Sequence, residues 1–162
     1  MATVTAESSA ELDGSAASLY AILADYHEGH PAILPRSYFT DLHVERGGRG
    51  AGTVIRFGVR LGGRVREVRA EVSEPEPGRV LVERILDERG TTTSFTVDPV
   101  SSHRARVSIH TTWNSAGLAG FVERWIAPML LRRIYRQQLR NLEQYAANSL
   151  SGTAPGHRQR GE

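Results

Sequence analysis

The sequence contains no cysteine, and this absence excludes a disulfide-bonded scaffold, a thiolate metal site and a cysteine nucleophile. Lysine is absent as well: all 20 basic residues are arginine, and because 18 residues are acidic the formal net charge is only +2. The arginines are dispersed along the chain, so this small surplus predicts no nucleic-acid partner, and the preference for arginine is typical of a GC-rich genome. The longest apolar run covers only residues 126–131, whereas a membrane span needs about 20 residues.

The length and composition predict one globular domain. A chain of 162 residues has the size of an ordinary single domain, and 40% hydrophobic with 23% charged residues excludes a disordered or fibrous protein. We expect this domain to cover residues 1–147, with a flexible tail over residues 148–162. Residues 1–7 have neither the basic nor the apolar part of an export signal, so we expect a cytoplasmic protein without stable membrane insertion.

A strand and two helical segments are predicted before residue 38. Residues 3–9 alternate weakly between polar and apolar side chains, which favours a strand. Residues 13–15 (Asp-Gly-Ser) supply N-cap chemistry for a helix over residues 16–26, where apolar residues recur at helical spacing. Residues 30–35 contain two prolines and are limited to a short helical turn.

From residue 38 to residue 113 the apolar residues alternate with polar ones, which is the period of half-buried β-strands. Short turns rich in glycine and proline separate these strands, and short connections join antiparallel neighbours. The sequence therefore predicts an antiparallel meander. Its six predicted strands are residues 41–45, 55–61, 67–72, 79–86, 91–97 and 105–113.

The chain returns to a helical period over residues 117–147. Pro128 either kinks this helix or begins a second helix at its first turn. Arg132, Arg136 and Arg140 recur on one side of it, and we expect them on a solvated outer face. The predicted apolar stripe consists of Phe121, Trp125, Leu131, Ile134, Tyr135, Leu139, Leu142 and Tyr145.

An α+β fold follows from this order: a strand, two short helices, an antiparallel meander and a long C-terminal helix. Only the last helix is long enough to cover the apolar face of the sheet, because about 20 helical residues span about 30 Å. A curved sheet that wraps around a straight helix leaves a wedge at one end. An apolar wedge of this kind is where a small ligand binds.

Four segments and the closing helix carry a resemblance to a known family. They are residues 15–26 (SAASLYAILADY), 47–52 (GGRGAG), 74–80 (EPEPGRV) and 93–97 (TSFTV). Together they resemble the helix-grip superfamily of START domains, Bet v 1-like proteins and bacterial polyketide cyclase/dehydrase-like (SRPBCC) proteins. The resemblance covers the chain from Val4 to about Ala147. It implies a curved antiparallel sheet around a long C-terminal helix and a cavity for lipids or polyketides, but it implies no single reaction.

The candidate site residues lie on the predicted inner faces of the helices and strands. Tyr26, His30 and Tyr135 are the candidate catalytic residues, because an acid/base group must lie within hydrogen-bond reach of the substrate. The predicted ligand-binding residues are Tyr20, Leu23, Tyr26, His30, Ile55, Phe57, Val59, Phe95, Val97, Ile109, Trp113, Leu131, Ile134 and Tyr135.

Histidine spacing does not predict a metal site. His27, His30 and His43 carry suitable nitrogen atoms, but their spacing does not match the zinc-protease helix motif and no acidic ligand converges on them. We therefore expect no metal and no cofactor. Residues 47–52 precede a strand rather than a helix, so they cannot cradle a phosphate at a helix N-terminus. The resemblance implies instead a mobile loop near the cavity entrance.

Glu83 and Arg84 lie in the middle of a predicted strand that is apolar on both faces. Whichever of them faces inward would be a buried charge, which requires a partner or a ligand. The pattern leaves open which of the two faces inward.

We predict a protein that binds a hydrophobic small molecule, a lipid or a polyketide-like compound, between the sheet and the C-terminal helix. The alternative is a cyclase, dehydratase or isomerase that acts on such a ligand by acid/base chemistry without a metal. A third hypothesis is regulation through contact of the arginine stripe with a membrane or RNA, which predicts association that weakens with salt. The sequence leaves open whether the chain forms a homodimer.

Overall fold

The computed structural model describes residues 2–116 and 119–152, and it leaves the side chains of residues 119–124 undescribed. The elements are β1 (Ala2–Asp13), α1 (Ala16–Ala24), α2 (Gly29–Ile33), β2 (Phe39–Arg46), β3 (Val54–Leu61), β4 (Arg64–Glu76), β5 (Val80–Ile85), β6 (Thr92–Ser101), β7 (Arg104–Ser115) and α3 (Ala119–Ser151). The predicted order of elements is confirmed, and most strands are longer than predicted.

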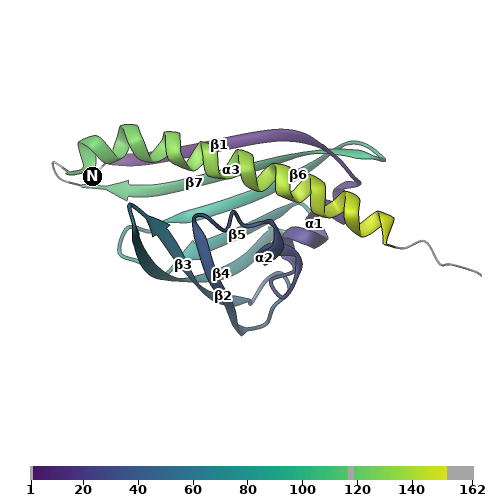
Figure 1. Cartoon of the computed structure of the whole chain (residues 1–162), viewed down its shortest axis with the longest axis horizontal. Helices are drawn as coiled ribbons and strands as arrows, with labels where there is room; N and C mark the ends of the chain where they lie inside the picture. Colours follow the sequence, from purple (N-terminus) through teal and green to yellow (C-terminus); the bar gives the residue numbers. More distant parts are fainter. Residues whose placement is uncertain (1, 117–118, 153–162) are drawn as a thin grey trace, which may run out of the picture.

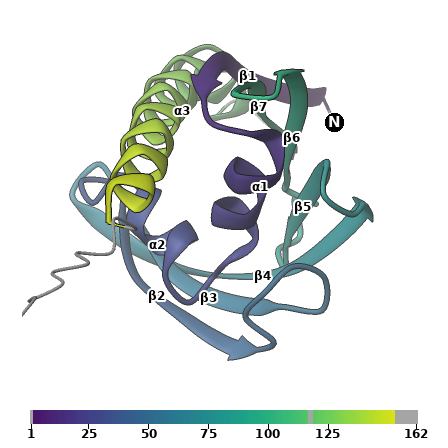
Figure 2. The same cartoon turned by 90° about the vertical axis from the view of Figure 1, so that its right-hand side faces the viewer.

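The strands form one antiparallel sheet in the order β1-β7-β6-β5-β4-β3-β2. From β2 to β7 each strand pairs with the next, and β1 then pairs with β7 along its whole length, from Ala2↔Ser115 to Asp13↔Arg104. The sheet curves strongly; α3 runs along its open side, and α1 and α2 lie within the curve at one end (Figures 1 and 2). This is the helix-grip fold that the resemblance implied.

The first helix begins where the sequence predicts and ends earlier. Ser15 caps it, because the Ser15 hydroxyl accepts a hydrogen bond from the backbone N–H of Ser18 at 3.1 Å. The helix ends at Ala24, two residues before the predicted end at residue 26, because Asp25 is extended. Tyr26 therefore leaves the helix, and its backbone N–H donates to the carbonyl oxygen of Gly48 at 2.8 Å.

The C-terminal helix is continuous through Pro128, so a second helix does not begin there. It continues to Ser151, four residues beyond the domain end predicted at residue 147. The remainder of the predicted tail, residues 153–162, lies outside the described residues.

The outer and inner faces of α3 follow the predicted phase with one exception. Ile134, Tyr135, Leu139 and Leu142 are buried, Leu131 and Tyr145 are half-buried, and Arg132, Arg136 and Arg140 are exposed. Trp125 was placed in the apolar stripe and is 69% exposed, which corrects that prediction. It lies on the side of the helix opposite Ala127 and Leu131, which face the sheet. The side chain of Phe121 lies outside the described residues.

The glycine-rich loop of residues 47–52 packs against the end of α1. Besides the bond from Tyr26 to Gly48, the loop is fixed at Gly50, which has a φ of +57°. A Cβ atom on Gly50 would lie 2.3 Å from the Glu74 carboxylate, so a side chain there requires that carboxylate to shift. Within the described structure none of these six residues lines the main cavity, and the expectation of a loop at the cavity entrance is wrong.

Candidate ligand-binding and acid–base site

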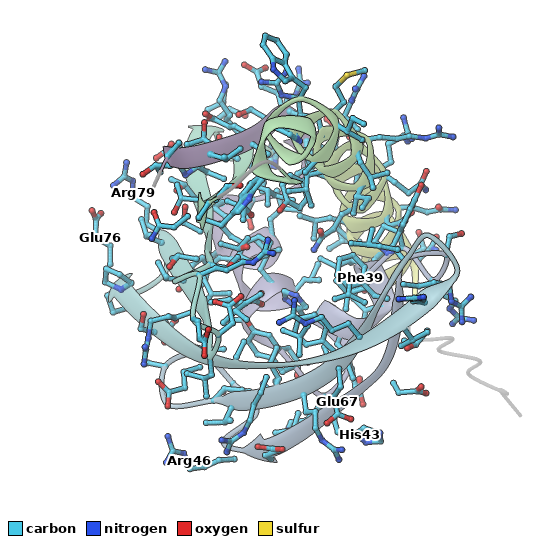
Figure 3. All side chains as sticks on the ribbon, turned by 90° about the vertical axis from the view of Figure 1, so that its left-hand side faces the viewer. Phe39, His43, Arg46, Glu67, Glu76 and Arg79 are labelled. Atoms are coloured by element: carbon cyan, nitrogen blue, oxygen red, sulfur yellow. The ribbon has the colours of Figure 1, made fainter. Side chains whose placement is uncertain are left out.

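A cavity of about 680 Å³ lies between the concave face of the sheet and the first half of α3. This volume falls within the range of about 300–1,000 Å³ that is usual for small-molecule sites. Figure 3 views the molecule from the end at which α3 begins, opposite the end that α1 and α2 close. The apolar wall consists mainly of Ile55, Phe57, Val59, Val68, Ile85, Phe95, Trp113, Ala127, Leu130, Leu131 and Ile134.

A histidine and a glutamate meet on this wall. His30 of α2 is 2% exposed, and its Nε2 lies 3.3 Å from Oε1 of Glu83 on β5, which is 8% exposed. The hydroxyl of Tyr26 donates to the same Oε1 at 2.7 Å from behind the wall. The Tyr26 ring stacks on the His30 ring with centroids 4.5 Å apart, and Phe95 contacts His30 edge-on. These aromatic contacts fix the orientation of the imidazole.

The contacts of His30 and Glu83 limit where the protons of this pair can lie. Nδ1 of His30 is 2.8 Å from the carbonyl oxygen of Leu23, and because a carbonyl only accepts, Nδ1 must carry a proton. The contact between Nε2 and Oε1 then needs one proton, which belongs either to an imidazolium or to a protonated Glu83. Oε1 already accepts from Tyr26, and one oxygen that accepts from two donors is typical of a carboxylate. An ion pair of an imidazolium His30 and a carboxylate Glu83 fits these contacts.

The ionisation of Tyr26 is suppressed by this environment. Burial of the ring raises the pKa of the Tyr26 hydroxyl well above its usual value, and the negative charge of Glu83 raises it further. Tyr26 therefore remains a hydrogen-bond donor to Glu83 at neutral pH.

A second polar group of the wall is a chain of hydroxyls. The hydroxyls of Tyr135 and Thr111 are hydrogen-bonded, and the Thr111 hydroxyl lies 2.7 Å from that of Thr93. Burial, above all, raises the pKa of Tyr135 to about 12. Tyr135 is therefore protonated at neutral pH and offers a polar contact in an otherwise apolar region, near the buried amide of Gln138.

Nine of the predicted ligand-binding residues line the cavity. They are His30, Ile55, Phe57, Val59, Phe95, Trp113, Leu131, Ile134 and Tyr135. Two of the three candidate catalytic residues, His30 and Tyr135, are among them. Contact of these side chains with a ligand stays a prediction.

The other five predicted ligand-binding residues do not line the cavity. Leu23, Val97 and Ile109 are at most 1% exposed in the packed core, because α1 occupies the concave side of the sheet over β6 and β7 (Figure 2). Tyr20 points away as well, and its hydroxyl donates to the Glu74 carboxylate at 2.7 Å. Tyr26 lies behind Glu83, so it can position that carboxylate but does not reach the cavity.

Glu83 is the residue that sequence reasoning did not assign to the site. The signal was present, because a charged pair in an apolar strand predicts one buried charge. The structure resolves the choice: Glu83 faces the cavity, and Arg84 faces outward, where it donates to Glu71 at 2.7 Å.

The three histidines considered for a metal are separated in the fold. His30 is buried, whereas His27 and His43 are exposed, and His43 lies on the outer face of the sheet (Figure 3). Within residues 2–116 and 119–152, no group of three or more metal-ligating side chains lies close enough together to hold an ion.

Comparison with known proteins agrees with this fold. The model of the family "Polyketide cyclase / dehydrase and lipid transport" matches residues 3–147, and the chain belongs to this family. No curated protein matches the sequence significantly. None of the described helices is long and apolar enough to cross a membrane.

Solved structures show the same architecture. The solution structure of the KanY protein (ms6282) is 32% identical, with a TM-score of 0.77 over 91% of this chain and 99% of that one. The ZhuI aromatase/cyclase from Streptomyces sp. R1128 is 17% identical, with a TM-score of 0.75 over 92% and 96% of the two chains. A START superfamily protein from Mycobacterium smegmatis is 14% identical, with a TM-score of 0.70 over 90% and 98%.

Proposed function

We propose that the chain binds a hydrophobic small molecule, a lipid or a polyketide-like compound, in the cavity between the sheet and α3. The observation that carries this proposal is the 680 Å³ cavity, whose surface is mainly apolar. Each 100 Å² of apolar ligand surface buried there contributes about 2.5 kcal/mol to binding. The family, and the aromatase/cyclase named among the similar structures, support the same class of ligand.

The binding proposal is tested by filling the cavity. Native mass spectrometry of freshly purified protein reveals a ligand that co-purifies, and titration with the neutral dye Nile red measures occupancy directly. Val59→Trp places a large ring on the wall, and we expect the affinity for Nile red to fall at least about tenfold, or about 1.4 kcal/mol. Val100→Trp, on an exposed part of β6 outside the cavity, is the matched control and leaves binding unchanged. Equal affinities in both variants contradict the proposal.

A second candidate function is supported by the ion pair on the wall. We propose that the chain acts on a β-hydroxy ketone of a polyketide-like ligand, as a cyclase or dehydratase without a metal. The Glu83 carboxylate takes the proton from the carbon next to the ketone, and the His30 imidazolium gives its Nε2 proton to the leaving hydroxyl, which departs as water. Tyr135 donates a hydrogen bond to a ligand oxygen.

The pair can then restore itself. After the reaction Glu83 holds a proton and Nε2 of His30 has none, and these two atoms are 3.3 Å apart. Transfer of that proton from Oε1 to Nε2 regenerates the starting ion pair. Throughout the cycle Nδ1 keeps its proton on the Leu23 carbonyl, so the ring does not rotate.

The test uses 4-hydroxy-4-phenylbutan-2-one, whose dehydration gives a conjugated ketone that is followed by ultraviolet absorbance. Glu83→Gln removes the base, and we expect the rate to fall about 100-fold or more while Nile red still binds. Glu71→Gln, on the outer side of the neighbouring strand, is the matched control and leaves the rate unchanged. If wild type and Glu83→Gln have equal rates and both still bind Nile red, the proposed reaction is wrong and only the binding function remains.

A further inference from the structure

We propose that Arg64 and Arg66, at the rim of the cavity, bind an anionic oxygen group, a carboxylate or a phosphate, at one end of an otherwise hydrophobic ligand. This inference rests on the proposed binding function and specifies its ligand as an anionic amphiphile. It follows from the position of the two arginines, from the pairing of the charges around them and from the spacing along β4 between the arginines and the level of Glu83.

Arg64 and Arg66 lie on the same face of β4 as the residues of the core. Side chains two residues apart on a strand point to the same face, so the series 64, 66, 68, 70 and 72 shares the concave side. Ala70 and Val72 are buried, Val68 is half-buried, and the two arginines at the start of the strand are exposed. The concave side of β4 therefore changes from apolar in the interior to cationic at the rim.

The same register places apolar residues opposite both arginines. On β3, Leu61 pairs with Arg64 and Val59 pairs with Arg66, and all four residues line the cavity. A long side chain in such a position lays its apolar stem along the wall and keeps its guanidinium at the water boundary. The two guanidinium groups are thus at the mouth of the cavity, where a ligand emerges.

The neighbouring charged side chains of the wall already have ion-pair or hydrogen-bond partners, whereas, within the described part of the chain, those of Arg64 and Arg66 do not. Arg56 is 3.2 Å from Glu67, and Arg69 donates to Glu45 at 2.6 Å. Asp87, the acid at the turn after β5, accepts hydrogen bonds from Thr91 and from the backbone N–H of Arg89.

Among the described residues, neither Arg64 nor Arg66 has a hydrogen bond or ion pair from its side chain. The rim therefore holds two cations with free donors.

The spacing along β4 defines the shape of the ligand. Val72 pairs with Glu83, the acid–base residue, and Val72 lies six positions after Arg66 on β4. At about 3.3 Å per residue the rim and the buried carboxylate are ~20 Å apart along the strand. An elongated ligand can hold its anionic group at the rim while its other end reaches the interior. A guanidinium matches both carboxylate and phosphate oxygens, so the shared chemistry is an anionic oxygen group.

The test compares three probes with the same chain: dodecanoate, dodecyl phosphate and 1-dodecanol. Each displaces Nile red from the full chain at low ionic strength. We expect wild type to bind the anionic probes about tenfold more tightly than the alcohol, or about 1.4 kcal/mol, and to lose this preference at high salt. The anionic probe that binds more tightly, dodecanoate or dodecyl phosphate, shows whether the site prefers a carboxylate or a phosphate.

The double variant Arg64→Gln/Arg66→Gln removes the preference and keeps the affinity for 1-dodecanol, which also shows that the variant is folded. Arg60→Gln is the matched control, because Arg60 lies on the outer face of β3 between Val59 and Leu61. A preference that is absent in wild type, or that survives in the double variant, overturns the inference. Failure of all three probes, the alcohol included, overturns the binding function instead.

Discussion

Removing the hydrogen bond between Tyr26 and Glu83 tests whether the buried Glu83 side chain is a charged carboxylate. Tyr26→Phe removes the hydroxyl that donates to Oε1 at 2.7 Å and keeps the ring that stacks on His30. A hydrogen bond to a charged group contributes about 1.5–3 kcal/mol, whereas one between neutral groups contributes about 0.5–1.5 kcal/mol. We therefore expect Tyr26→Phe to lower the free energy of unfolding by about 2 kcal/mol in wild type and by about 1 kcal/mol in the Glu83→Gln background.

The assay is urea denaturation at pH 7 of wild type, both single variants and the double variant. Tyr145→Phe is the control, because the half-buried Tyr145 hydroxyl bonds to none of the described residues; its cost stays within about 0.5 kcal/mol. The reasoning is refuted if Tyr26→Phe costs the same in both backgrounds. That result means that the acceptor is neutral or that the bond does not form.

Because burial raises the pKa of Tyr135 to about 12, against an unfolded value near 10, the folded state retains a proton that the unfolded state loses. This stabilisation is complete below about pH 10 and is lost as the pH rises through about 12. Wild type therefore loses up to roughly 3 kcal/mol of unfolding free energy over this pH range through Tyr135, as measured by urea unfolding. Tyr135→Phe does not show this part of the loss, whereas Tyr145→Phe shows all of it. Gly50→Ala collides with Glu74, so we expect it to lower the unfolding free energy more than Gly52→Ala. Gly52 is the matched control, because it has a similar positive φ but open space around it. Equal losses of about 1–2 kcal/mol in the two variants show that backbone strain alone matters. Trp125→Gln changes the unfolding free energy by less than about 0.5 kcal/mol, because the ring is exposed. Leu142→Ala, at a buried position of the same helix, lowers it by about 2–5 kcal/mol. A large effect at Trp125 indicates that its face of α3 is covered in solution.

The architecture was predictable because its signals are local. Alternation with a period of two and short glycine-containing turns specify an antiparallel meander, and the single long amphipathic segment at the end specifies what covers it. The cavity was predictable as well, since a straight helix cannot fill a curved sheet along its whole length. The boundaries were less accurate: α1 ends before Tyr26 because the backbone of that residue bonds to Gly48, a loop residue remote in sequence.

The site was predictable only in part, because its chemistry depends on contacts between distant elements. The sequence predicts that either Glu83 or Arg84 faces inward, and only the pairing of β5 with β4 and β6 determines which one does. Tyr26 had the right residue type, but its hydroxyl points at Glu83 from behind the wall. The rim arginines look in the sequence like any other charged positions of a strand, and only the cavity distinguishes them from Arg60.

The pairing of β1 with β7 has a consequence for the chain as it leaves the ribosome. Residues 2–13 are made well before residues 104–115, the strand that completes them. At about 5–20 residues per second, the first strand must wait roughly 5–20 s for its neighbour. During that interval its outward positions carry Glu7, Glu11 and Asp13, and repulsion between these charges on different nascent chains opposes premature strand-to-strand association.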